Sequence, residues 1–166
     1  MRLKPKYRLL SSTELQALEK EFVQFLATQS ITAADWQSIK DTSSDKVDGL
    51  IVLFSNQILE KILTEVKLLE KRSHQRIELF KIHPERIVMY ALEVENQPSG
   101  LWEDEDMMDL HTIWSGKIPS QIIRAVKQVE ESPENETFNL MQGGAIISRN
   151  EKLYETLQNL YQSRQS

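Results

Sequence analysis

The residues best suited to metal or acid–base chemistry gather in the acidic stretch 103–111. Asp106, Asp109 and His111 stand close together there, and carboxylates and imidazoles both bind divalent metals and carry protons. These three residues are the candidates for a metal site in a small metal-dependent enzyme or binder. No second histidine stands one helical turn away, and no His-Glu-x-x-His motif occurs. We therefore favour a surface helix whose acidic first turn satisfies its own N–H groups.

No other pattern in the chain indicates catalysis. The chain has no cysteine, which excludes disulfides, thiolate nucleophiles and thiolate-bound zinc or iron–sulfur sites. It also has no phosphate-binding loop, nucleophile elbow or EF-hand pattern. Gly143-Gly144 is better explained as a turn than as a phosphate cradle. We predict no catalytic residue and no cofactor, and we favour a protein that is not an enzyme.

Charge is segregated along the sequence. Residues 1–10 form a purely basic arm, whereas Glu93–Asp109 holds seven acids and no lysine or arginine. Segregated opposite charges favour complementary docking. The leading hypothesis is therefore a non-enzymatic interaction or scaffold protein in which arm and acidic segment meet, in a homodimer or with a protein partner. The competing interpretation of the arm is a frayed, solvated terminus. The interaction candidates are Arg2, Lys4, Lys6 and Arg8 in the arm and Glu103, Asp104 and Glu105 in the acidic segment.

Nucleic acid and membrane are the least favoured partners. The basic cluster 67–76 contains Lys67, Lys71, Arg72 and Arg76, but glutamates interleave with it. The formal net charge of -5 and the pI of about 5.3 also repel nucleic acid. The longest apolar run, Leu50–Phe54, is far shorter than the ~18 residues of a membrane span. The basic start lacks the apolar core of a signal peptide, so a cytoplasmic location is expected.

The elements that must position these residues follow from hydrophobic spacing. One helix is expected behind a capping box of Ser11 and Glu14 and fades near Thr28. A second is expected behind Thr32 and Asp35. The longest helix is expected over Val47–Lys71, after a polar loop at Asp41–Asp48, and the alternating runs Arg76–His83 and Arg86–Glu95 predict an antiparallel hairpin.

Beyond the hairpin, helical spacing returns. Helices are expected over the acidic segment and from Pro119, followed by a polar loop at Ser132–Glu136 and a third strand at Thr137–Gln142. A closing helix is expected behind Ser148. With 40% hydrophobic and 27% charged residues, the chain reads as one compact α+β domain over residues 1–166. N-terminal helices would pack on a small antiparallel sheet, the hairpin plus a third strand, with further helices and a C-terminal helix after the hairpin.

Several stretches also carry a family resemblance. They are KYRLLSSTELQALEKEFVQFLATQSITAADWQSIK at Lys6–Lys40, FSNQILEKIL at Phe54–Leu63, LFKI at Leu79–Ile82 and QGGAIISRNEKLYE at Gln142–Glu155. In these stretches the chain resembles a family of small bacterial proteins of unknown function, whereas Asn96–Glu136 is unmatched. The resemblance implies one compact domain and a cytoplasmic location. It implies no activity and no site residue.

Overall fold

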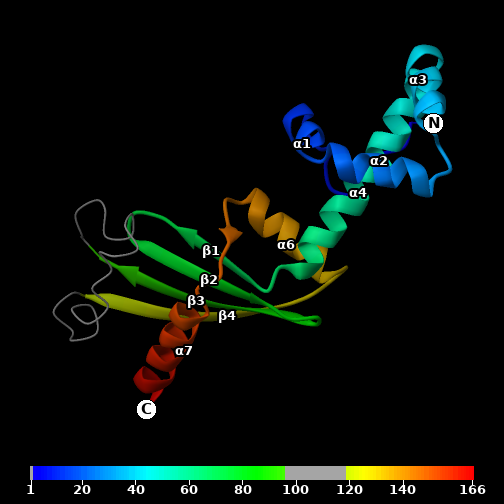
Figure 1. Ribbon diagram of the computed structural model, residues 1–166. Coiled ribbons are helices and arrows are strands. Elements are labelled where there is room, and N and C mark those ends of the chain that lie inside the picture. The colour runs from blue at the N-terminus through cyan, green and yellow to red at the C-terminus, as the bar shows by residue number, and fades with distance from the viewer. Residues whose placement is uncertain (1, 96–118) are drawn as a thin grey trace. The chain divides into compact units, whose positions relative to one another are not determined.

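A computed structural model describes residues 2–95 and 119–166 (Figure 1). The chain divides into two compact units, Met1–Leu63 and Thr64–Ser166, and each is described by itself. The α+β class is confirmed, since helices come first, an antiparallel sheet follows and a helix closes the chain. The single domain expected over residues 1–166 stays a prediction. None of the helices among the described residues is long and apolar enough to cross a membrane.

Helices build the Met1–Leu63 unit. The capping boxes predicted at Ser11 and at Thr32 are confirmed. The predicted first helix is divided in two at Leu18, and the predicted loop at Asp41–Asp48 is wrong. Only Ser43 separates the last two helices, because serine and aspartate also suit a helix start. The helices are α1 (Ser12–Ala17), α2 (Glu19–Thr28), α3 (Ala33–Thr42) and α4 (Ser44–Glu65), which runs two residues beyond the unit's end.

An antiparallel sheet dominates the Thr64–Ser166 unit. Its strand order is β4-β3-β2-β1-β5. The predicted hairpin is confirmed as β2 and β3, in a register that runs from Arg76 opposite Glu93 to Ile82 opposite Ile87. The elements are β1 (Leu68–Arg72), β2 (Arg76–Ile82), β3 (Arg86–Val94), β4 (Ser120–Gln128), α6 (Pro133–Gln142), β5 (Ile146–Ile147) and α7 (Glu151–Gln165).

Two of the predicted helices are strands for part of their length. The helix predicted over Val47–Lys71 ends at Glu65, and its last residues lie in β1. The helix predicted from Pro119 is β4, which pairs with β3 along its whole length. Isoleucine and valine fit both spacings, and pairing with a neighbouring strand decides between them.

The third predicted strand is wrong as well, since its residues form a helix. Thr137–Gln142 lies in α6, which starts inside the predicted loop at Ser132–Glu136. The Ser132 hydroxyl caps this helix by accepting from the Asn135 N–H at 3.1 Å, and proline suits the first helical position. The closing helix α7 is confirmed, but its cap is Asn150 and not Ser148.

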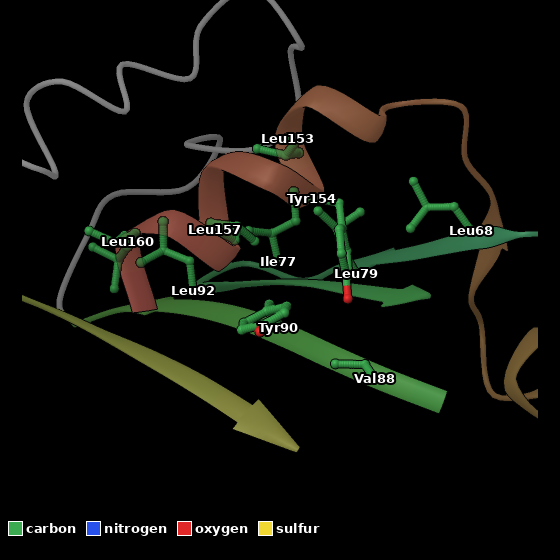
Figure 2. Close-up of a cluster of buried hydrophobic side chains, with 11 residues drawn as sticks. Leu68, Ile77, Leu79, Val88, Tyr90, Leu92, Leu153, Tyr154, Leu157 and Leu160 are labelled. Atoms are coloured by element: carbon green, nitrogen blue, oxygen red, sulfur yellow. The ribbon is translucent and has the colours of Figure 1, made fainter. Parts of the chain in front are cut away.

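The two faces of the sheet pack against different helices. On one face, called the α7 face, alternate strand residues meet α7, and Figure 2 shows Leu153, Leu157 and Leu160 of this helix over the strands. On the opposite face, called the α6 face, Leu140 and Met141 of α6 pack against Leu69, Ile82 and Ile87. Because side chains alternate along a strand, β1, β2 and β3 each contribute to both clusters. The residues of the α7-face core are Leu68, Ile77, Leu79, Val88, Tyr90, Leu92, Val94, Leu153, Tyr154, Leu157 and Leu160.

Candidate functional site

The α6 face carries a pocket of about 370 Å³. This volume falls within the ~300–1,000 Å³ of small-molecule sites. Strands β1 to β4 form its floor and α6 with the turn after it forms a wall. Its floor residues include Lys71, Glu78, Phe80, Ile87, Met89, Ala125 and Lys127, and its wall residues are Glu136, Asn139, Leu140, Gly143 and Ala145.

Strand register brings these floor residues together. Lys71 lies opposite Glu78 in the β1–β2 ladder. Phe80 lies opposite Met89, which in turn lies opposite Ala125 of the edge strand. Residues directly opposite in an antiparallel ladder share a face. The sheet therefore lays an apolar strip across four strands, with charges at its margins.

The wall contributes a buried carboxylate. The Glu136 side chain is only 8% exposed, and it accepts a hydrogen bond from Lys127 Nζ at 2.6 Å. This hydrogen bond raises the pKa of Lys127, so the lysine stays charged and neutralises Glu136. Gly144 has φ +101°, a conformation that only glycine adopts without strain, and it lets the chain turn from α6 toward β5.

At the opposite margin of the pocket, the two charged residues differ in whether they have an ion-pair partner. Glu78 accepts from Arg76 at 3.0 Å, and Arg76 also reaches Glu93 at 3.2 Å. Lys71 is half-buried and its side chain passes Gly144. Among the residues that the structure describes, no carboxylate lies within 4.0 Å of the Lys71 ammonium group. The pocket is thus an apolar cavity with one lysine that lacks an ion-pair partner there.

Among the residues that the structure describes, strand β4 lies at an edge of the sheet beside this pocket. The Val129 N–H donates to Glu85 and the Glu95 N–H donates to Pro119. The odd-numbered residues of β4 therefore direct their backbone groups toward β3. The even-numbered residues direct theirs outward, and the Ser120 carbonyl at this edge accepts from Arg164 at 3.1 Å. The outward groups that remain belong to Ile122, Arg124, Val126 and Gln128.

The candidate metal residues and the acidic interaction residues lie outside the described part of the chain. This applies to Asp106, Asp109 and His111 and equally to Glu103, Asp104 and Glu105. The metal site and the docking of the arm on the acidic segment stay predictions. Elsewhere, within residues 2–95 and 119–166, no group of three His, Asp or Glu side chains is placed to hold a metal ion.

The basic arm lies against helices of its own unit. Lys6 Nζ and the Tyr7 hydroxyl both donate to Glu60 of α4, at 2.8 and 2.5 Å. These hydrogen bonds, that of Lys6 first, lower the pKa of Glu60. Arg8 makes a two-pronged pair with Glu14 at 2.7 and 2.8 Å. The hydrogen bonding from Arg8 is the main cause that lowers the pKa of Glu14 to about 2.

Further contacts hold the arm at both ends. The Leu10 N–H donates to the buried hydroxyl of Ser55 at 3.1 Å, and Arg2 lies 3.6 Å from Asp48. The arm is therefore docked rather than frayed, although exposed ion pairs each contribute only ~0–1 kcal/mol. Lys4 is exposed.

The basic cluster 67–76 does not form a positive surface. Arg72 Nε lies 3.0 Å from Glu70, and Arg76 is held between Glu78 and Glu93. Lys67 Nζ donates to a backbone carbonyl at the end of α4. Nucleic acid needs unpaired cations on one face, so the geometry gives this alternative no support.

Sequence reasoning missed the pocket and the free edge. Lys71 was assigned to a helix end, Ala125 and Lys127 to a helix, and Glu136 to a loop. The one available signal was the alternation in Arg76–Glu95, which already placed Glu78, Phe80 and Met89 in strands that are apolar on both sides.

Comparison with known proteins identifies a family. A model described as a family of unknown function (DUF6495) matches residues 1–162, including the stretch Asn96–Glu136 that the resemblance left out. No curated protein and no solved structure matches the chain.

Proposed function

Because the chain belongs to a family of unknown function (DUF6495), we propose its function from its own geometry: a non-enzymatic interaction protein that binds an extended acidic segment of a partner protein. The partner segment adds to the sheet as a further strand beside β4. The observation that carries this proposal is the row of outward backbone groups at Ile122, Arg124, Val126 and Gln128. Strand addition to such an edge takes its affinity from main-chain hydrogen bonds.

The length of β4 supports strand addition. It has nine residues, whereas proteins usually protect a free edge by shortening it or by placing proline or a bulge there. All nine residues pair with β3 in an unbroken register from Gln128 at Arg86 to Ser120 at Val94. The register of β4 is therefore unbroken, so a partner strand can pair with this edge over the same length.

The charge of this edge selects an acidic partner. β4 contains Arg124 and Lys127 and no acid. Arg164 lies at the Ser120 end, and Arg86 lies opposite Gln128 at the other end. Arg124 lies four residue steps from Ser120 and four from Gln128, a distance of about 13 Å each. A partner strand with glutamates or aspartates on the α7 face would meet these arginines, and electrostatic complementarity of this kind gives specificity.

A second copy of the chain fits this edge less well. Two β4 strands paired antiparallel about their midpoint would place Arg124 opposite Arg124, and like charges directly opposite are destabilising. A different partner protein is therefore preferred over a homodimer. The proposed compartment is the cytoplasm, the location that the sequence resemblance implies, and fractionation of the native cell checks it.

The test uses a labelled peptide of the same length as β4 in which valine and glutamate alternate. Fluorescence anisotropy should show binding to the full chain, and the matched valine–lysine peptide should bind at least about tenfold more weakly. Arg124→Glu should weaken binding of the acidic peptide by a similar factor. Equal affinity for the two peptides would refute the proposal.

A proline variant tests the backbone contribution. Val126→Pro removes one outward N–H and leaves every N–H that faces β3, a substitution that edge strands tolerate. It should abolish peptide binding, whereas Val126→Thr, which keeps the N–H, should not. Circular dichroism establishes folding of each variant. Undiminished peptide binding by a folded Val126→Pro variant would contradict strand addition. So would a second result: the wild type binds no peptide but forms a dimer in light scattering, and the Val126→Pro variant loses that dimer.

A further inference from the structure

The α6-face pocket offers other groups for binding than the outward backbone groups of β4 that the proposed strand addition uses. Its floor of Phe80, Ile87, Met89 and Ala125 and the Leu140 side chain in its wall present mostly carbon to the cavity. About 370 Å³ of space among such side chains suits an apolar group of moderate size. The ligand must therefore have an apolar body.

The charges around the cavity select its polar end. Glu136 is neutralised by Lys127 at 2.6 Å, and Glu78 accepts from Arg76 at 3.0 Å. Lys71 has no carboxylate within 4.0 Å among the described residues. Its ammonium group is a point charge with three donors, and a carboxylate satisfies it.

From this combination we propose that the pocket binds a small amphipathic carboxylate, with its apolar tail over Phe80, Met89 and Ala125 and its carboxylate at Lys71. Half-burial of Lys71 strengthens the ion pair relative to one in open water. Asn139, which lines the wall, offers an amide as a further donor. A ligand cation would instead meet Lys71 and Lys127 at close range and is disfavoured.

Octanoate is the probe, with octanol as the neutral control and octylamine as the cationic control. Methyl resonances of the methionines report the site, because Met89 lines the pocket. Titration of octanoate into the full chain should shift the Met89 resonance and saturate. Octanol should bind about fivefold more weakly, the factor expected for one partly solvated ion pair, and octylamine more weakly still.

Two variants separate the contribution of the ion pair to binding from that of the apolar contact. Lys71→Gln should weaken octanoate binding about fivefold and leave octanol binding unchanged, whereas Lys67→Gln, which removes an exposed lysine outside the pocket, should change neither. Ala125→Phe fills the floor with an aromatic side chain that suits a strand and should weaken both ligands.

Several outcomes overturn the proposal. They are an unmoved Met89 resonance at high octanoate, equal affinity for octanoate and octanol, tighter binding of octylamine, and a Lys71→Gln variant that binds octanoate like the wild type. None of these outcomes bears on peptide binding at β4. Failure of the pocket and failure of the proposed function are therefore distinguishable.

Discussion

Ser148 provides the sharpest test of how the Thr64–Ser166 unit is held together. Its hydroxyl donates to Glu70 Oε2 at 2.6 Å, and Glu70 is only 6% exposed in β1. Its oxygen also accepts from the Asn150 N–H at 3.2 Å. Ser148→Ala removes both contacts and leaves the hydrogen bond that Arg72 Nε donates to Glu70 Oε1 at 3.0 Å.

The expected loss follows from these contacts. A hydrogen bond to a charged group contributes ~1.5–3 kcal/mol, and the lower end applies because Arg72 still satisfies Glu70. With the lost Asn150 contact, Ser148→Ala should reduce the free energy of unfolding by about 2 kcal/mol. Urea denaturation followed by far-ultraviolet circular dichroism measures this change. Ser163→Ala, which removes a hydroxyl that donates to a carbonyl within α7, is the control and should stay within about 0.5 kcal/mol.

A double-mutant cycle decides whether Ser148 acts through Glu70 or as a helix cap. Combining Ser148→Ala with Glu70→Gln should reveal a coupling energy of about 1 kcal/mol, because the amide accepts a weaker hydrogen bond than the carboxylate. A helix cap at Ser148, as the sequence predicted, would show no such coupling. Additivity of the two changes within about 0.3 kcal/mol would refute the contact.

The remaining predictions concern the core, the arm and the pocket wall. Leu157→Ala, at a residue with 0% exposure, should cost about 3 kcal/mol in urea denaturation, whereas Ile146→Ala, at 61% exposure, should cost little. Glu14 has its pKa lowered to about 2, so its stabilising effect is present above the ordinary value of 4.5 and is lost as the pH falls toward 2. Melting temperatures of Glu14→Gln and the wild type should therefore differ near neutral pH and converge in acid. Lys127→Met should lower the melting temperature at pH 7, because it leaves the buried carboxylate of Glu136 without its lysine; an unchanged melting temperature would contradict this.

The parts of the fold that were predicted correctly are those determined by residues close together in the sequence. The capping boxes at Ser11 and Thr32 need only residues three positions apart. The hairpin of β2 and β3 needs only two alternating runs and the short turn between them. These features form wherever the same residues occur together, so no knowledge of distant neighbours was required.

The errors arose where a distant neighbour decides the conformation. Leu68–Arg72 continues the apolar spacing of α4, yet it is a strand because β2 and β5 pair with it. Ser120–Gln128 has the apolar spacing of a helix behind Pro119, yet pairing with β3 makes it a strand. Intrinsic strand preferences depend strongly on context, so the hydrogen bonds offered by an adjacent strand prevail.

The candidate sites show the same division. By itself the sequence determined the α+β class, the hairpin, the closing helix, the absence of thiol chemistry and the family resemblance. Only the tertiary structure decided that Lys71, Met89, Ala125 and Glu136 meet around one pocket and that β4, among the described strands, lies at the edge of the sheet with outward hydrogen-bonding groups. A pocket and an edge are properties of strand order and register, and these depend on which segments pair across long separations in the chain.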